Sequence, residues 1–182
     1  FFTATWPKDV QRMALKFLTN AVQLNVGNST KLVANENVTQ HVRVMQGADK
    51  MSSLRTCIAE IEAGTLGAAC ADKPKTLIFT RTKKDADRVA NELWDAGMSV
   101  DSIHGDKEQW QRTKVLGQFK RSEILILVAT DVAARGLDVK DISHVINFDF
   151  PATKGKAGIE DFVHRIGRTG RAGRKGTAIT FF

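Results

Sequence analysis

Two arginines near the end of the chain, Arg168 and Arg171, stand three residues apart in a glycine- and arginine-rich segment, residues 167–176. Two guanidinium groups at this spacing can both contact one multiply charged anion, as arginine fingers contact a γ-phosphate. The composition also matches disordered RNA-binding tails of the RG type. A helical pattern at 161–166 precedes the segment and an apolar strand pattern at 177–182 follows it, so we predict a loop inside the fold.

Three other junctions join an apolar strand to a helix, and they carry Thr82, Gly105 and Thr130. The N-terminus of a helix offers unpaired N–H groups and a positive dipole, which can cradle the phosphates of a nucleic-acid strand. Caps and turn glycines occur in every α/β domain, so each residue alone is more readily explained by a structural role. Three such junctions at one edge of a sheet favour a binding surface. His104 is interpreted as a turn residue and is assigned no catalytic role.

Arg135 lies directly before Gly136, a conformationally flexible residue, and both follow the predicted strand 124–128. A guanidinium in this setting suits contact with a backbone phosphate or with another domain.

The elements that must position these residues alternate between strand and helix from Val38 onward. Strand patterns at 76–79, 99–103 and 124–128 are each followed by a turn and a helix. This alternation predicts an α/β domain with a mostly parallel sheet and right-handed crossovers. Ligands of such sheets gather at the carboxyl ends of the strands, where these residues fall.

Capping residues predict where the helices begin and end. Thr82 and Asp85 have the spacing of a capping box, and Gly97 is expected to end that helix. Asp106 is the expected N-cap of the following helix, with Gln109 at its third position.

The first part of the chain differs from the rest. Pro7 opens a helical pattern, and a short strand is expected at 21–26. An Asn-, Ser- and Thr-rich linker is expected at 28–37, before a domain that spans 38–182.

Composition favours a basic protein that binds an anionic partner. The 182 residues include 27 Lys and Arg against 20 Asp and Glu, a net charge of +7, which favours nucleic acid. Cys57 and Cys70 lack the spacing of a metal or disulfide motif, so no metal site is predicted. No apolar run is long enough to span a membrane and no signal peptide is recognisable, so we expect no membrane partner and an intracellular protein, in the nucleus or the cytoplasm.

Six segments in order resemble the motifs of the DEAD-box RNA helicases. Residues 3–5 are similar to motif III and residues 77–83 to motif IV, while residues 103–106 with Gln109 and Arg112 resemble motif IVa and the adjacent QxxR element. Residues 129–138 and 164–171 resemble motifs V and VI. The resemblance implies that residues 38–182 are the C-terminal RecA-like domain and residues 1–27 the tail of the N-terminal one.

The resemblance also implies a role for each matched residue. It implies RNA backbone contacts by Arg81, Thr82, Gly105, Gln109, Thr130 and Arg135. It implies ATP contacts by Gly136, Asp138, Arg168 and Arg171, of which Arg168 and Arg171 are the catalytic pair at the γ-phosphate. It implies interdomain coupling through Thr3, Thr5, Arg112, Asp131, His164 and Arg165.

Some positions depart from the family pattern. Thr3 replaces the usual serine, and Phe148 and Phe162 stand where the family usually has tyrosine. The segment 152–159 is longer than typical and suggests a mobile basic loop. His164 separates the chain from DEAH-box and RecQ-like enzymes, which are expected to carry glutamine there.

The chain contains neither a Gly-x-x-x-x-Gly-Lys-Ser/Thr phosphate loop nor an Asp-Glu-Ala-Asp segment. We therefore expect half of an ATP-dependent RNA helicase, inactive by itself, with the ligands of Mg²⁺ in a separate N-terminal RecA-like domain. ATP and RNA are the expected ligands, and RNA is expected to bind independently of its sequence. The alternative is a nucleotide-independent RNA-binding or scaffolding module, which would not need two arginines at a γ-phosphate.

Overall fold

A computed structural model describes residues 8–24, 34–67, 73–134, 137, 139–153 and 155–182. The chain divides into two compact units, Phe1–Val33 and Ala34–Phe182. This division falls inside the predicted linker 28–37. The assignment of residues 1–27 to a preceding RecA-like domain stays a prediction.

The first unit contains helix α1, Lys8–Phe17, at the position that the apolar spacing predicts. The expected strand at 21–26 is wrong for residues 21–24, which are neither helix nor strand, and residues 25 and 26 lie outside the described part. Val22 and Leu24 are exposed, and no neighbouring strand in the described part of this unit offers them hydrogen bonds. A strand without a pairing partner is not stable in water.

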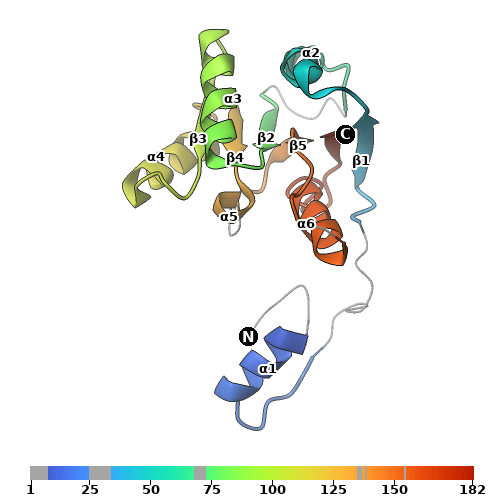
Figure 1. Cartoon of the computed structure of the whole chain (residues 1–182), viewed down its shortest axis with the longest axis vertical. Coiled ribbons are helices and arrows are strands. Elements are labelled where there is room, and N and C mark those ends of the chain that lie inside the picture. Colours follow the sequence, from blue (N-terminus) through green and yellow to red (C-terminus); the bar gives the residue numbers. More distant parts are fainter. Residues whose placement is uncertain (1–7, 25–33, 68–72, 135–136, 138, 154) are drawn as a thin grey trace. The chain divides into compact units, whose positions relative to one another are not determined.

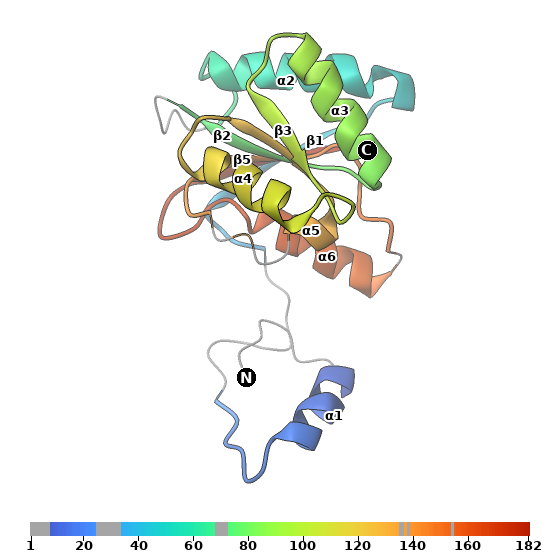
Figure 2. The same cartoon turned by 90° about the vertical axis from the view of Figure 1, so that its left-hand side faces the viewer.

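The second unit is a six-stranded parallel sheet covered by helices on both faces (Figures 1 and 2). The strands are β1 (Val38–Arg43), β2 (Lys75–Phe79), β3 (Val100–Ile103), β4 (Ile126–Ala129), β5 (Ile142–Asn147) and β6 (Gly176–Phe181). Their order across the sheet is β1-β6-β5-β2-β4-β3. The predicted α/β RecA-like fold is confirmed, and the four predicted strands of this unit agree with the observed bounds to within two residues.

The helices are α2 (Lys50–Glu62), α3 (Lys83–Asp95), α4 (Gln109–Lys120), α5 (Asp131–Ala134) and α6 (Lys156–Ile166), with a 3₁₀ turn at Gly47–Asp49. Helices α2 and α3 bury their apolar side chains against one face of the sheet. Helices α4, α5 and α6 cover the other face (Figure 2). Because β2, β4 and β6 are covered on both sides, every residue in them is buried, as expected for inner parallel strands.

Helix α3 follows its predicted capping pattern. The Thr82 hydroxyl accepts a hydrogen bond from the Asp85 backbone N–H at 3.1 Å. Gly97 follows the last turn with a φ of +82°, a left-handed conformation that glycine adopts without steric cost.

Helix α4 begins two residues later than the capping pattern predicts. Its N-cap is Glu108, which forms a capping box with Gln111, so Gln109 is the first helical residue and not the third. Asp106 was the expected cap, but its carboxylate forms an ion pair with Lys83 of α3. Asp106 therefore lies in the turn before the helix.

The predicted loop at 152–159 is wrong for residues 156–159, which form the first turn of α6. Residue 154 lies outside the described part. A Cβ atom at Gly158 would stand 1.9 Å from the Thr153 carbonyl oxygen, so glycine lets the helix pack closely against this segment. Thr153 also donates a hydrogen bond to the Asp161 carboxylate at 3.0 Å, which ties the segment to the helix.

Candidate functional site

The carboxyl ends of β2, β4 and β3 lie side by side, because these three strands are neighbours in the parallel sheet. Thr82 follows β2, Gly105 follows β3 and Thr130 follows β4. The structure therefore brings the three predicted junction residues to one edge. Thr82 and Gly105 are exposed there, while Thr130 is buried.

The loop after β2 is held by an acidic residue that the sequence motifs did not reveal. One carboxylate oxygen of Asp149 accepts the Arg81 backbone N–H at 3.1 Å. The other accepts the Lys50 ammonium at 2.9 Å. Asp149 thereby fixes the backbone at Arg81, while the Arg81 side chain is exposed. Its position two residues after β5 was the available signal, since the other site residues also follow strands.

The turn at Gly105 leaves open space on its outer side. A Cβ atom there would meet only the far end of the Lys83 side chain, at 3.6 Å, and Gly105 is not among the glycines with positive φ. The described fold therefore does not require glycine at this position. A missing side chain lets a ligand approach the backbone closely.

A buried hydrogen-bond group holds the other side of this turn. His104 Nε2 lies 2.9 Å from Asp87 Oδ1, and the Ser102 hydroxyl donates to the same oxygen at 2.6 Å. Burial acts to raise the pKa of Asp87, but the hydrogen bonds from Ser102 and His104 together hold it below its usual value. His104 anchors the turn, as its interpretation as a turn residue predicts.

Gln109 and Arg112 are tied to each other on the first turn of α4. The Gln109 side-chain oxygen accepts a hydrogen bond from Arg112 Nη1 at 3.1 Å. Arg112 Nε is buried and has no hydrogen-bond partner among the described residues. Gln109 itself is exposed next to the Gly105 turn.

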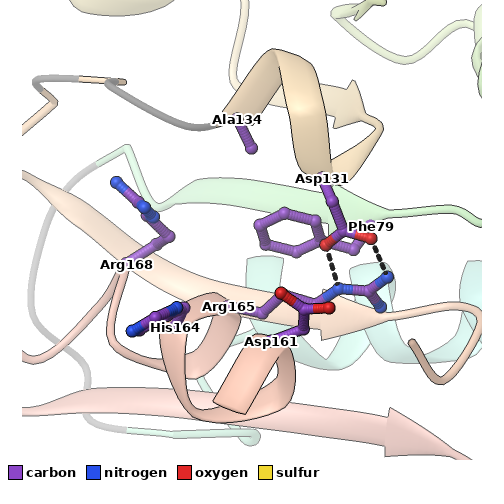
Figure 3. Close-up of a pocket in the computed structure, with 7 residues that line it drawn as sticks. All are labelled: Phe79, Asp131, Ala134, Asp161, His164, Arg165 and Arg168. Carbon is purple, nitrogen blue, oxygen red and sulfur yellow. Dashed lines mark hydrogen bonds and ion pairs between the residues drawn. The ribbon is translucent and has the colours of Figure 1, made fainter. Parts of the chain in front are cut away.

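Arg165 of α6 reaches across to α5, where its guanidinium forms a bidentate pair with the Asp131 carboxylate at 2.6 and 2.7 Å (Figure 3). The same group donates to the Asp149 carbonyl at 2.5 Å and lies 5.0 Å from the centre of the Phe79 ring. Arg165 is 2% exposed. The residues predicted for interdomain coupling at 131 and 165 are therefore partners of each other inside one domain.

A small pocket lies between α5 and α6 (Figure 3). It is lined by Phe79, Asp131, Ala134, Asp161, His164, Arg165 and Arg168. Its cavity volume is about 30 Å³, which suits water and is far below that of a nucleotide pocket.

The loop that carries Arg168 and Arg171 is built into the fold. The buried Thr169 hydroxyl lies 2.7 Å from the Ile142 carbonyl and 2.9 Å from that of Ser143. Gly170 has a φ of +67°, and a Cβ atom there would collide with Val38. These contacts confirm the loop and exclude a disordered tail.

Arg171 is bonded to the backbone of the same loop: its Nε donates a hydrogen bond to the Gly167 carbonyl at 2.8 Å. Arg168 lines the pocket three residues earlier. The two arginines therefore lie on one loop, with Arg168 at the pocket and Arg171 bonded to the loop backbone. Thr169 was missed by sequence reasoning, although its position between them was visible.

Several predicted site residues lie outside the described part of the chain, so nothing tests their placement. They are Thr3, Thr5, Arg135, Gly136 and Asp138. Among the residues that are described, no group of three or more His, Cys, Asp or Glu side chains could hold a metal ion. No helix among the described residues is long and apolar enough to cross a membrane.

Comparison with known proteins gives consistent matches. Residues 49–173 match the family described as helicase conserved C-terminal domain. The whole chain is 48% identical to the ATP-dependent RNA helicase-like protein DB10 of Nicotiana sylvestris, and covers 27% of that protein. It is 47% identical to the ATP-dependent RNA helicase dbp2 of Neurospora crassa over 181 residues, and covers 30% of it. The chain thus spans less than a third of these curated relatives.

Solved structures show the same likeness. S. cerevisiae Dbp5 bound to RNA and ADP BeF3 superposes with a TM-score of 0.80 at 30% identity, over 100% of this chain and 44% of that one. The yeast DEAD-box splicing factor Prp28 superposes with a TM-score of 0.69 at 30% identity, over 100% of this chain and 36% of that one.

Proposed function

We propose that this chain, which belongs to the family described as helicase conserved C-terminal domain, is the C-terminal half of a DEAD-box ATP-dependent RNA helicase. In this role it binds the RNA backbone and completes an ATP site whose other wall is an N-terminal RecA-like domain. Closure of the two domains on ATP and RNA would unwind short duplexes or remodel RNA–protein complexes. With RNA as its substrate, the protein would act inside the cell, in the nucleus or the cytoplasm.

One observation carries this proposal. Asp131 directly follows Thr130 at the RNA-side edge, and its carboxylate is paired with Arg165, three residues before Arg168. The guanidinium of this bidentate pair is buried and the carboxylate is partly exposed, and the two parallel hydrogen bonds restrict the relative geometry of the two side chains. The pair therefore links the residues proposed to bind RNA to the residues proposed to bind ATP within one domain.

We assign the RNA contacts to Arg81, Thr82, Gly105, Gln109, Thr130 and Arg135. The exposed Gly105 turn and the N-termini of α3 and α4 support this assignment, since backbone N–H groups bind phosphates without reading bases. We assign Gly136, Asp138, Arg168 and Arg171 to ATP. Thr3, Thr5, Arg112, Asp131, His164 and Arg165 are proposed to couple the domains.

The described residues offer positive charge that suits ATP, but the cavity beside them is smaller than ATP. Arg168 and Arg171 provide cationic donors for a triphosphate, and the adjacent cavity is too small to enclose a nucleotide. The described residues also provide no cluster of ligands for Mg²⁺, so we place those ligands in the N-terminal domain. ATP supplies a phosphoanhydride bond, and this chain contributes positive charge where the γ-phosphate would lie.

The isolated chain is expected to fold but to release no phosphate from ATP, even with excess single-stranded RNA. It has two well-packed apolar clusters beside its sheet, yet it lacks the phosphate loop that positions ATP. The measurement is steady-state phosphate release by chain 1–182, with a protein that contains both domains as the positive control. Turnover above a buffer blank, in material free of contaminating ATPases, would overturn the half-enzyme proposal.

RNA binding by the isolated chain is expected to be weak, salt-dependent and indifferent to base sequence. Each phosphate neutralised on a single strand adds about 0.7 to the slope of log affinity against log salt concentration. Titrations of several unrelated RNA oligomers at a series of salt concentrations measure this slope. A strong preference for one short sequence, or an affinity that does not change with salt, would contradict backbone recognition.

A further inference from the structure

Trp110 is a large apolar side chain that the fold leaves in solvent. It is the second residue of α4 and is 66% exposed. The buried residues of this helix are Val115 and Phe119, which lie five and nine positions further on. At 100° per residue these positions point roughly 140° and 180° away from Trp110, so Trp110 lies on the solvent face of the helix. Packing within the domain does not account for it.

The surroundings of Trp110 are polar and carry both signs of charge. Gly105, Asp106, Glu108 and Gln109 are exposed before it, at the carboxyl edge of the sheet, and the Asp106 carboxylate is paired with Lys83. Lys114 is exposed one helical turn later on the same face. Trp110 is also the one exposed large apolar residue of α4, whose residues are all described.

This pattern fits nucleic acid better than a protein partner. Protein interfaces bury contiguous apolar patches, whereas a single aromatic ring among amides and cations is the arrangement of a platform for single-stranded nucleic acid. Each base presents a flat face that can stack on an indole ring, and each phosphate can be neutralised by a lysine.

We propose that Trp110 stacks on one base of the bound RNA and that Lys114 contacts a phosphate beside it. This inference rests on the proposed RNA-binding function and extends it. The exposed face of α4 continues the RNA path beyond Gly105 and Gln109, and it adds a contact to a base where the other assigned residues contact only the backbone.

Trp94 provides a matched control. It is 64% exposed and lies next to the last residue of α3. Helix α3 begins at the carboxyl end of β2 and ends before β3 begins, so Trp94 lies at the opposite edge of the sheet from Trp110. The two helices also cover opposite faces (Figure 2). The two tryptophans are therefore alike in exposure and different in position.

The test uses a protein that contains both helicase domains, bound to a non-hydrolysable ATP analogue. Fluorescence anisotropy measures its affinity for a labelled single-stranded oligoadenylate of about 15 nucleotides, a length within the range of single-strand binding sites. Trp110→Ala is expected to weaken binding about 5- to 100-fold, while Trp110→Phe stays close to the original affinity. Trp94→Ala is expected to have no effect.

An oligomer of the same length that lacks all of its bases separates stacking from a structural effect, because no register on it offers a base. Trp110→Ala should weaken binding to the oligoadenylate and should have no effect on binding to the abasic oligomer. Lys114→Ala should lower the salt slope by about 0.7, whereas Trp110→Ala should leave it unchanged.

Three outcomes would overturn the inference: equal effects of Trp110→Ala and Trp94→Ala, unchanged affinity in Trp110→Ala, or an equal loss from Trp110→Ala on the oligoadenylate and on the abasic oligomer. In each of these cases the original protein still binds RNA, and the proposed function stands. Absence of RNA binding by the original protein would instead refute both.

Discussion

Replacing Arg171 with alanine in a protein that contains both helicase domains is expected to lower ATP turnover by roughly 10³-fold or more. This is the scale attributed to an arginine that stabilises charge on the transferring γ-phosphoryl group. Arg171→Lys should restore little activity, because a lysine offers a point charge in place of a planar guanidinium. The measurement is steady-state phosphate release with saturating RNA and ATP.

The alternative to a catalytic role is that Arg171 only stabilises its own loop. The Nε of Arg171 donates to the Gly167 carbonyl at 2.8 Å, so the side chain also braces its own loop. If bracing is its whole role, Arg171→Ala should lower the melting temperature of the domain and reduce turnover only in proportion to the unfolded fraction. A large fall in melting temperature, with near-normal turnover at low temperature, would refute the catalytic role. A stable protein with 10³-fold lower turnover would support it.

Replacing Asp131 with alanine is expected to destabilise the domain by about 3–5 kcal/mol, the cost of leaving one buried ionic partner uncompensated. The side chain of Arg165 is 2% exposed. Its guanidinium donates hydrogen bonds to both carboxylate oxygens of Asp131. Without that carboxylate the buried guanidinium loses its anionic partner, while its hydrogen bonds to the carbonyl of Asp149 and the amide oxygen of Asn147 remain. Urea unfolding of chain 1–182 measures the change in the free energy of unfolding.

A second ion pair in the same domain serves as the control. Arg88 and Glu92 are four residues apart on α3, with side chains 48% and 37% exposed. Glu92→Ala should cost well under 1 kcal/mol, because water screens exposed pairs. Adding Arg165→Met to Asp131→Ala should recover part of the loss, since it removes the unpaired charge. A similar small effect for Asp131→Ala and Glu92→Ala would show that the Arg165 pair contributes little to stability.

The Asp131 result also bears on interdomain coupling. If Asp131 and Arg165 transmit closure between domains, variants that remain folded at low temperature should lose RNA stimulation of ATP turnover. If the pair only stabilises the domain, those variants should retain RNA stimulation wherever they are folded. The ratio of turnover with and without RNA, measured below the melting temperature, distinguishes the two roles.

The sequence by itself was sufficient for the family, the α/β class and the positions of the main strands. These features depend on local patterns: apolar runs such as 76–79, the Thr82 and Gly97 limits of α3, and motif residues in a fixed order. Each pattern acts within a few residues along the chain, so it can be read without knowing what packs against it. The loop at 167–176 was predictable for the same reason, from the helix and strand on either side.

Only the tertiary structure decided which polar groups meet. Asp106 does not cap α4 and instead pairs with Lys83 of α3, and residues 21–24 form no strand in a unit whose described part offers them no pairing partner. The Arg165 pair with Asp131 joins positions 34 residues apart, and the Asp149 contact to the Arg81 backbone joins positions 68 apart. Hydrogen bonds and ion pairs require donor and acceptor within about 3 Å. Arg81 and Asp149 reach that distance because β2 and β5 are neighbours in the parallel sheet, and Arg165 reaches Asp131 because α5 and α6 cover the same face of that sheet.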